Sequence, residues 1–126
     1  MTLRDEYSDK YPGIYRLAVK LTFKPALYEW INAILPEALH LKPAQPEQGG
    51  VYLLPVCDYI NKYELMLKKF YLEIFKCELW RFQRDDKTWP KDLSWETFKT
   101  FFSYEFSSEI SDMEADTPIY DDENDG

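Results

Sequence analysis

The sequence predicts an α+β domain in which a small, mainly antiparallel sheet packs on one long helix, with shorter helices beside it. Residues 58–82 carry apolar side chains at intervals of three and four, with no Gly or Pro among them, which indicates a long amphipathic helix. Residues 15–23 alternate apolar and polar side chains, as a half-buried strand does, and the alternation returns from Phe102. A bundle made only of helices is the alternative, because a short apolar run fits either kind of element.

The first predicted element is the strand at residues 15–23. Its apolar residues are Tyr15, Leu17, Val19, Leu21 and Phe23, and they alternate with Arg16, Ala18, Lys20 and Thr22. Because successive side chains of a strand point to opposite faces, we expect Leu17, Val19 and Leu21 to face inward and Arg16, Lys20 and Thr22 to face solvent. A polar face fits an antiparallel sheet or an edge position better than the centre of a parallel sheet.

A short helix, a loop and a short strand follow. Pro25 occupies a favourable first helical position, and apolar residues at helical spacing continue to Ile34, before Pro36. Residues 36–50 have little periodicity and contain several Pro and Gly residues, so they are predicted to form a surface loop. A loop of this length is a candidate functional segment. The apolar run at 51–54 is predicted to be a short strand.

Residues 58–82 are predicted to form the helix along which the core is built. Its apolar stripe consists of Tyr59, Tyr63, Met66, Phe70, Ile74 and Cys77, widened by Ile60, Leu67 and Phe75. Asp58 can accept backbone N–H groups as an N-cap, and Arg81 and Arg84 lie where the helix dipole favours cations. Phe70 is at the centre of the stripe, so we expect it to be buried against the sheet.

Two further elements are predicted near the C-terminal end. Ser94 can cap a short helix whose apolar positions are Trp95, Phe98 and either Phe101 or Phe102. Alternation from Phe102 to Ile110 then indicates a second half-buried strand. Residues 113–126 are acidic and poor in apolar side chains, which predicts a disordered tail. Pro118, Ile119 and Tyr120 are its apolar exception.

Length and composition indicate one domain. A chain of 126 residues with 45% hydrophobic and 30% charged residues fits a single globular domain, which we expect to span residues 1–112. No run approaches the roughly 20 apolar residues of a membrane-spanning helix. The first residues lack the apolar core of a signal peptide, so we expect a cytoplasmic protein. In that compartment Cys57 and Cys77 are expected to be reduced thiols.

The net charge of −8 is concentrated at one end of the chain. Residues 1–100 carry all 15 basic side chains and 14 of the 23 acidic ones, whereas residues 101–126 carry 9 acids and no base. A basic footprint for nucleic acid is absent, and the overall negative field repels phosphate backbones. We therefore expect no direct binding of nucleic acid.

Motifs for catalysis or cofactor binding are missing. His40 is the single histidine, and the two cysteines match no zinc or redox spacing. None of the four glycines belongs to a phosphate-binding loop. Asp85 and Asp86 lie in a predicted polar turn without the spacing of a calcium loop. We expect no cofactor and no metal; a small enzyme with an unrecognised carboxylate or tyrosine site is the alternative to a binding protein.

A role in protein binding is the function that the sequence favours. Aromatic residues make up 17% of the chain, and Trp and Arg residues occur together in a short stretch. Such residues are enriched at protein interfaces. The candidate binding residues are Trp80, Arg81, Arg84, Trp89 and Trp95, together with Asp121, Asp122 and Glu123 of the tail. The competing interpretation is that the three Trp side chains seal the end of the core. The partner is a protein of unknown identity, and a homodimer is a further option.

Overall fold

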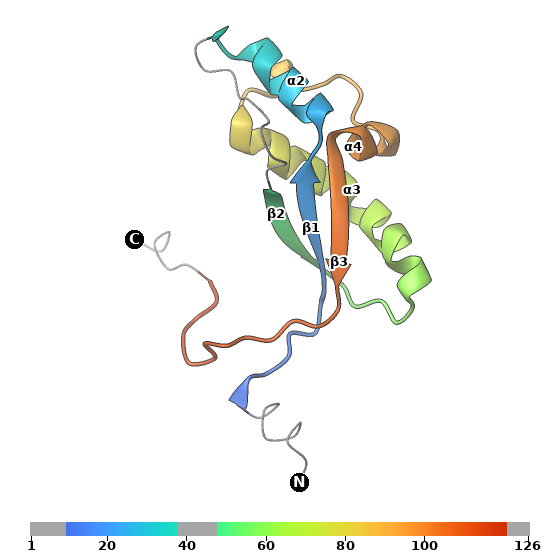
Figure 1. Cartoon of the computed structure of the whole chain (residues 1–126), viewed down its shortest axis with the longest axis vertical. Coiled ribbons are helices and arrows are strands. Elements are labelled where there is room, and N and C mark those ends of the chain that lie inside the picture. The colour runs from blue at the N-terminus through green and yellow to red at the C-terminus, as the bar shows by residue number, and fades with distance from the viewer. Residues whose placement is uncertain (1–9, 38–47, 121–126) are drawn as a thin grey trace.

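The computed structural model describes residues 10–37 and 48–120, and within them it contains three α-helices and a three-stranded antiparallel sheet (Figure 1). The elements are β1 (Leu17–Phe23), α2 (Pro25–Ile34), β2 (Gln48–Leu54), α3 (Tyr63–Phe82), α4 (Trp95–Phe101) and β3 (Phe102–Ser107), with 3-10 turns η2 (Ile60–Lys62) and η3 (Asp86–Thr88). The predicted α+β class is confirmed, and the sheet excludes the all-helical alternative. No helix among these residues is long and apolar enough to cross a membrane.

The strand predicted first is the centre of the sheet. The strand order is β2-β1-β3, and β1 is antiparallel to both neighbours. Its inner face is buried as predicted, and on the other face Arg16 is exposed while Lys20 and Thr22 are partly exposed. Ala18 is buried on that face too, and Tyr15 lies outside the strand and is exposed. The prediction of an antiparallel strand was correct, but β1 is not at an edge.

Strand β2 begins earlier than the apolar run and contains a bulge. The pairing of β1 with β2 shifts between Lys20 and Thr22, so that Gly49 and Gly50 share one position in the ladder. A Cβ atom on Gly49 would lie 2.9 Å from the ring of Phe23, and one on Gly50 would lie 2.9 Å from Glu78 Oε1. Glycine is therefore required at both positions, because the backbone of β2 lies too close to Phe23 and Glu78 for a side chain to fit. The sequence pattern had assigned these two glycines to a loop, whereas they belong to β2.

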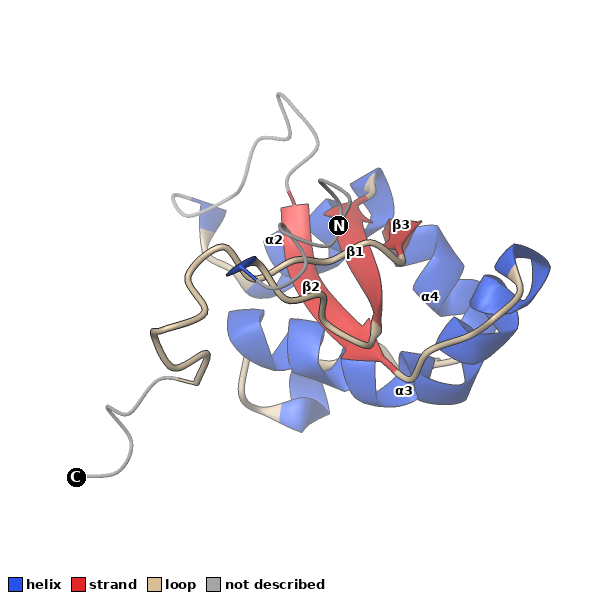
Figure 2. Ribbon diagram, turned by 90° about the horizontal axis from the view of Figure 1, so that it is seen from below, coloured by secondary structure: helices blue, strands red, loops and turns tan. Residues whose placement is uncertain are grey.

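Helix α3 lies across one face of the sheet (Figure 2). It begins at Tyr63, and η2 precedes it, so the predicted start and cap at Asp58 are wrong. Its buried residues are Leu67, Ile74, Phe75, Glu78 and Leu79. Phe70 is 38% exposed, so the prediction that it is buried is also wrong.

The error at Phe70 is one of rotation about the helix axis. The buried residues of α3 are centred about 100° from Phe70, which is the turn that one residue makes in an α-helix. Leu65 and Leu72 are exposed as well, so apolar residues surround most of the helix. When apolar side chains cover several faces, their spacing cannot decide which face meets the sheet.

The core is rich in aromatic rings, as the composition suggested. Phe75, Phe98 and Phe102 are fully buried. Their ring centres lie 5.2–5.7 Å apart, within the range of favourable edge and tilted contacts. The three residues come from α3, α4 and β3, so this cluster joins the helices to the sheet.

Helix α4 and strand β3 follow one another directly, as predicted. Ser94 Oγ accepts the backbone N–H of Thr97 at 3.2 Å and caps α4. Strand β3 ends at Ser107, three residues before Ile110, and beyond it the carbonyl oxygen of Ile110 accepts a hydrogen bond from the N–H of Ile14 at 2.8 Å. The two terminal segments therefore run beside each other beyond the sheet (Figure 1).

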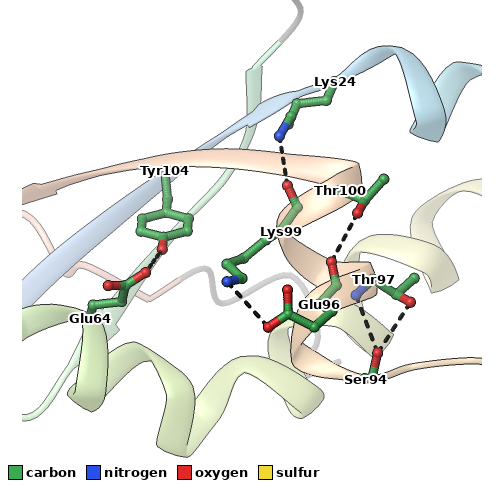
Figure 3. A network of polar contacts seen from close by, with 8 residues as sticks. All are labelled: Lys24, Glu64, Ser94, Glu96, Thr97, Lys99, Thr100 and Tyr104. Carbon is green, nitrogen blue, oxygen red and sulfur yellow. Dashed lines mark hydrogen bonds and ion pairs between the residues drawn. The ribbon is translucent and has the colours of Figure 1, made fainter.

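Polar contacts fix α4 and β3 against their neighbours (Figure 3). Lys24, just before α2, donates from Nζ to the carbonyl oxygen of Lys99 at 2.8 Å. Tyr104 of β3 donates its hydroxyl to Glu64 of α3. Burial and this hydrogen bond raise the pKa of Tyr104 above its ordinary value. The first bond joins α4 to the start of α2, and the second joins β3 to α3.

Candidate protein-interaction groove

A groove of about 420 Å³ lies between β2 and the C-terminal half of α3. Its lining residues are Tyr52, Glu73, Lys76, Cys77, Trp80, Arg81 and Trp89. Five of them come from α3, where Glu73, Lys76 and Trp80 recur at steps of three and four and so share one side of the helix. Tyr52 comes from β2, and Trp89 follows η3. We call this surface the α3–β2 groove.

A buried carboxylate fixes the wall of the groove. Glu78 of α3 is 0% exposed, and its Oε1 accepts hydrogen bonds from Gly50 N–H and Tyr52 O–H, each at 2.7 Å. Arg81 Nη1 lies 3.7 Å from the same oxygen. The second oxygen, Oε2, is buried with no hydrogen-bond partner among the described residues. Because buried acids are stabilised by such donors, Glu78 clamps β2 to α3 at the glycine bulge.

Burial and the clamp both favour the protonated form of Tyr52. Burial raises the pKa of the Tyr52 hydroxyl above its ordinary value, and the hydrogen bond to Glu78 raises it further. Tyr52 therefore stays protonated and keeps donating its hydrogen bond at neutral pH. Its ring is held in place as one wall of the groove, before any ligand arrives.

The rim of the groove combines an exposed ring with cations. Trp80 is 50% exposed, and the Arg84 guanidinium carbon lies 4.6 Å from the centre of a Trp80 ring. Arg81 lies 6.0 Å from the ring centre of Tyr52. Both distances are within the range of cation–π attraction, so the guanidinium groups are held over flat aromatic surfaces.

Trp89 is fixed by the turn that carries it. Its Nε1 donates to the carbonyl oxygen of Gln83 at 2.8 Å, and the ring is partly buried. Asp85 caps η3 by accepting the N–H of Lys87, and Trp30 of α2 donates from Nε1 to the carbonyl oxygen of Thr88 at 3.0 Å. Trp89 is thus a rigid end of the groove.

The structure brings only part of the predicted binding set together. Trp80, Arg81 and Trp89 line the groove, and Arg84 is on its rim. Trp95 is elsewhere, partly buried in α4 and stacked on Phe98 with ring centres 5.6 Å apart. For Trp95 the competing interpretation, in which the ring closes the core, agrees with the structure. Residues Asp121, Asp122 and Glu123 lie outside the described residues.

Sequence reasoning missed Tyr52 and the clamp residue Glu78. Nothing in the spacing distinguishes Glu78 from the other acids of α3, because its role depends on a bulge in a different element. The available signal was the Gly49-Gly50 pair immediately before an apolar run, which marks a close approach of backbone to another group.

The remaining candidates from the sequence are the acids, the two cysteines, the histidine and the loop at 36–50. Among residues 10–37 and 48–120, no group of three or more His, Cys, Asp and Glu residues is arranged to hold a metal ion. Cys57 and Cys77 are free thiols. His40 and most of the predicted loop at 36–50 lie outside the described residues.

Comparison with other proteins adds no family. No family model, no curated protein and no solved structure matches this chain.

Proposed function

We propose that this protein is a small interaction module that binds a protein partner in the α3–β2 groove. The observation that carries the proposal is Trp80, a half-exposed ring under the Arg84 guanidinium at the edge of a preformed hollow. Trp, Tyr and Arg dominate the binding energy of many interfaces, and truncating such a residue costs about 2 kcal/mol or more of binding free energy. We expect the module to act in the cytoplasm and not to bind nucleic acid directly.

The groove is rigid in the way that favours binding. Glu78 holds the Tyr52 wall, and the turn after α3 holds Trp89. A wall that is already ordered loses little conformational entropy when a partner docks, which increases affinity. Exposed Trp80 supplies the apolar area that the partner would cover.

The same contacts favour binding over the enzyme alternative. Glu78 is fully covered, so its carboxylate cannot touch a substrate in the groove. The raised pKa of Tyr52 keeps its proton in place at neutral pH, which opposes a role as a general base. The carboxylate and tyrosine of the groove therefore support its shape.

Photo-crosslinking tests the proposal. A p-benzoylphenylalanine at the exposed groove position Glu73 is expected to capture a discrete protein from cells. The product is expected to fall about tenfold or more when Trp80→Ala is added, because a lost interface anchor of that size reduces binding by this factor. The matched control carries the photo-reactive residue at Glu105, on the open face of the sheet. Equal products from both positions, or no effect of Trp80→Ala, would contradict the proposal.

A further inference from the structure

The groove carries more positive than negative side chains, which favours a ligand that is negatively charged. Lys76 and Arg81 line it and Arg84 stands on its rim, whereas Glu73 is the one exposed acid among the described lining residues. Glu78 offsets part of the charge of Arg81, at 3.7 Å. A surface of aromatic rings and excess cations is complementary to a peptide that carries an aromatic or aliphatic anchor among acids.

One segment of this chain has that composition. Ile119 is 68% exposed and Tyr120 is 87% exposed, so both anchors are accessible in the structure. Asp116 precedes the pair, the acidic run Asp121-Asp122-Glu123 follows it, and residues 101–126 contain no basic side chain. The segment 116–123 is therefore an apolar pair enclosed by negative charge.

The tail leaves the domain on the side of β2, the strand that forms one wall of the groove. The N–H of Asp112 donates to the carbonyl oxygen of Pro12 at 3.0 Å, which anchors the start of the tail. From there residues 113–120 pass to the side of the sheet where β2 and the C-terminal end of α3 lie, as both views show (Figures 1 and 2). The eight residues that follow Asp112, residues 113–120, can span about 28 Å when extended.

We propose that the segment 116–123 docks into the α3–β2 groove of its own molecule, with Ile119 and Tyr120 against Trp80 and the acids facing Lys76 and Arg84. In the structure the described part of this segment, residues 116–120, is exposed and undocked. Because the two sites are tethered, docking is an intramolecular equilibrium that does not depend on protein concentration. If the groove binds a partner, as proposed above, the tail and the partner compete for it, and the tail inhibits binding.

A native cysteine makes the contact measurable in the full-length chain. Cys77 lines the groove and is exposed. In a chain with Cys57→Ser and Pro118→Cys, docking is expected to bring the new thiol close to Cys77, and mild oxidation is expected to give a monomeric, disulfide-linked product. Formation of this product is expected to be independent of protein concentration and about tenfold faster than for a control with Cys57→Ser and Ser107→Cys, whose second thiol lies at the end of β3.

Two changes are expected to abolish the fast reaction. Ile119→Ser with Tyr120→Ser removes the anchors and keeps every charge, whereas salt at about 1 M shortens the Debye length to about 3 Å and screens the charge attraction. Crosslinking no faster than the control, or crosslinking only between two chains at high concentration, would overturn the proposal.

A second readout separates this inference from the proposed function. Photo-capture of a partner from the Glu73 position is expected to increase when Ile119 and Tyr120 are replaced, because the competing tail is removed. If capture depends on Trp80 but no disulfide forms between Cys77 and the thiol introduced by Pro118→Cys, the interaction module stands and only the tail contact fails. If the disulfide forms but nothing is captured, the tail contact stands and the proposed partner binding fails.

Discussion

Two regions of this molecule use the same residue types in opposite ways. At the α3–β2 groove, the guanidinium carbon of Arg84 lies 4.6 Å from a ring centre of Trp80. At α4, Nζ of Lys99 lies 5.6 Å from a ring centre of Trp95. The ring of Trp95 packs against the rings of Phe98 and Tyr71. Trp80 is half exposed and stacks on no core ring in the described part of the chain. A Trp beside a cation therefore says little about function until its other face is known. At α4 that face is core, and at the groove it is open.

The largest expected effect lies in the core beneath α4. Phe98→Ala is expected to lower the free energy of unfolding by about 3–5 kcal/mol, because it removes a fully buried ring from a tightly packed cluster. Phe70→Ala on α3 is the matched control and is expected to change it by less than about 1 kcal/mol. Chemical denaturation of both variants measures the difference. Similar losses at the two positions would show that the face of α3 is misassigned.

The clamp of the groove is expected to have a smaller but clear effect on stability. Glu78→Ala leaves the N–H of Gly50 and the hydroxyl of Tyr52 without their acceptor, which is expected to cost about 1–3 kcal/mol. Amide exchange at Gly50 is expected to speed up more than exchange in β3. Unchanged protection at Gly50 would mean that β2 is held by the sheet alone.

The two Trp residues separate stability from binding. Trp95→Ala is expected to lower the unfolding free energy by about 1–3 kcal/mol through lost ring contacts, whereas Trp80→Ala is expected to lower it by less than about 1 kcal/mol. Thermal melts provide this comparison, and the photo-capture assay is expected to show the reverse order. A Trp80→Ala protein that melts far below the wild type would assign Trp80 to the core.

The smallest expected effect concerns the start of α4. Hydrogen bonds from Thr97 and Ser94 hold the pKa of Asp92 below its ordinary value of 3.8. A lowered pKa in the folded state stabilises the fold above the ordinary pKa, and this contribution is lost as pH falls through the lowered value. Asp92→Asn is therefore expected to lower the melting temperature slightly at pH 7, and this difference is expected to shrink as the pH falls from 7 through the lowered pKa of Asp92. A constant difference across this range would point to a cause other than ionisation.

The sequence alone was sufficient for elements whose signals are local. Pro25 at the first helical position, Ser94 at the cap of α4 and the alternation of β1 each act within a few residues, and the structure has all three. The aromatic core also followed from composition, because large rings bury the most area. The charge separation between residues 1–100 and 101–126 likewise follows from the sequence alone.

Only the tertiary structure decided which face of α3 is inside and where the groove lies. Apolar residues surround α3, so the choice between Phe70 and Phe75 depended on how the sheet and α4 pack against the helix. Glu78 became a clamp because a bulge in β2 brings Gly50 and Tyr52 to it across 28 and 26 residues of chain. Trp80 and Trp95 each have a cation four residues later, Arg84 and Lys99. Burial separates the two rings because it depends on contacts between elements that are distant in sequence.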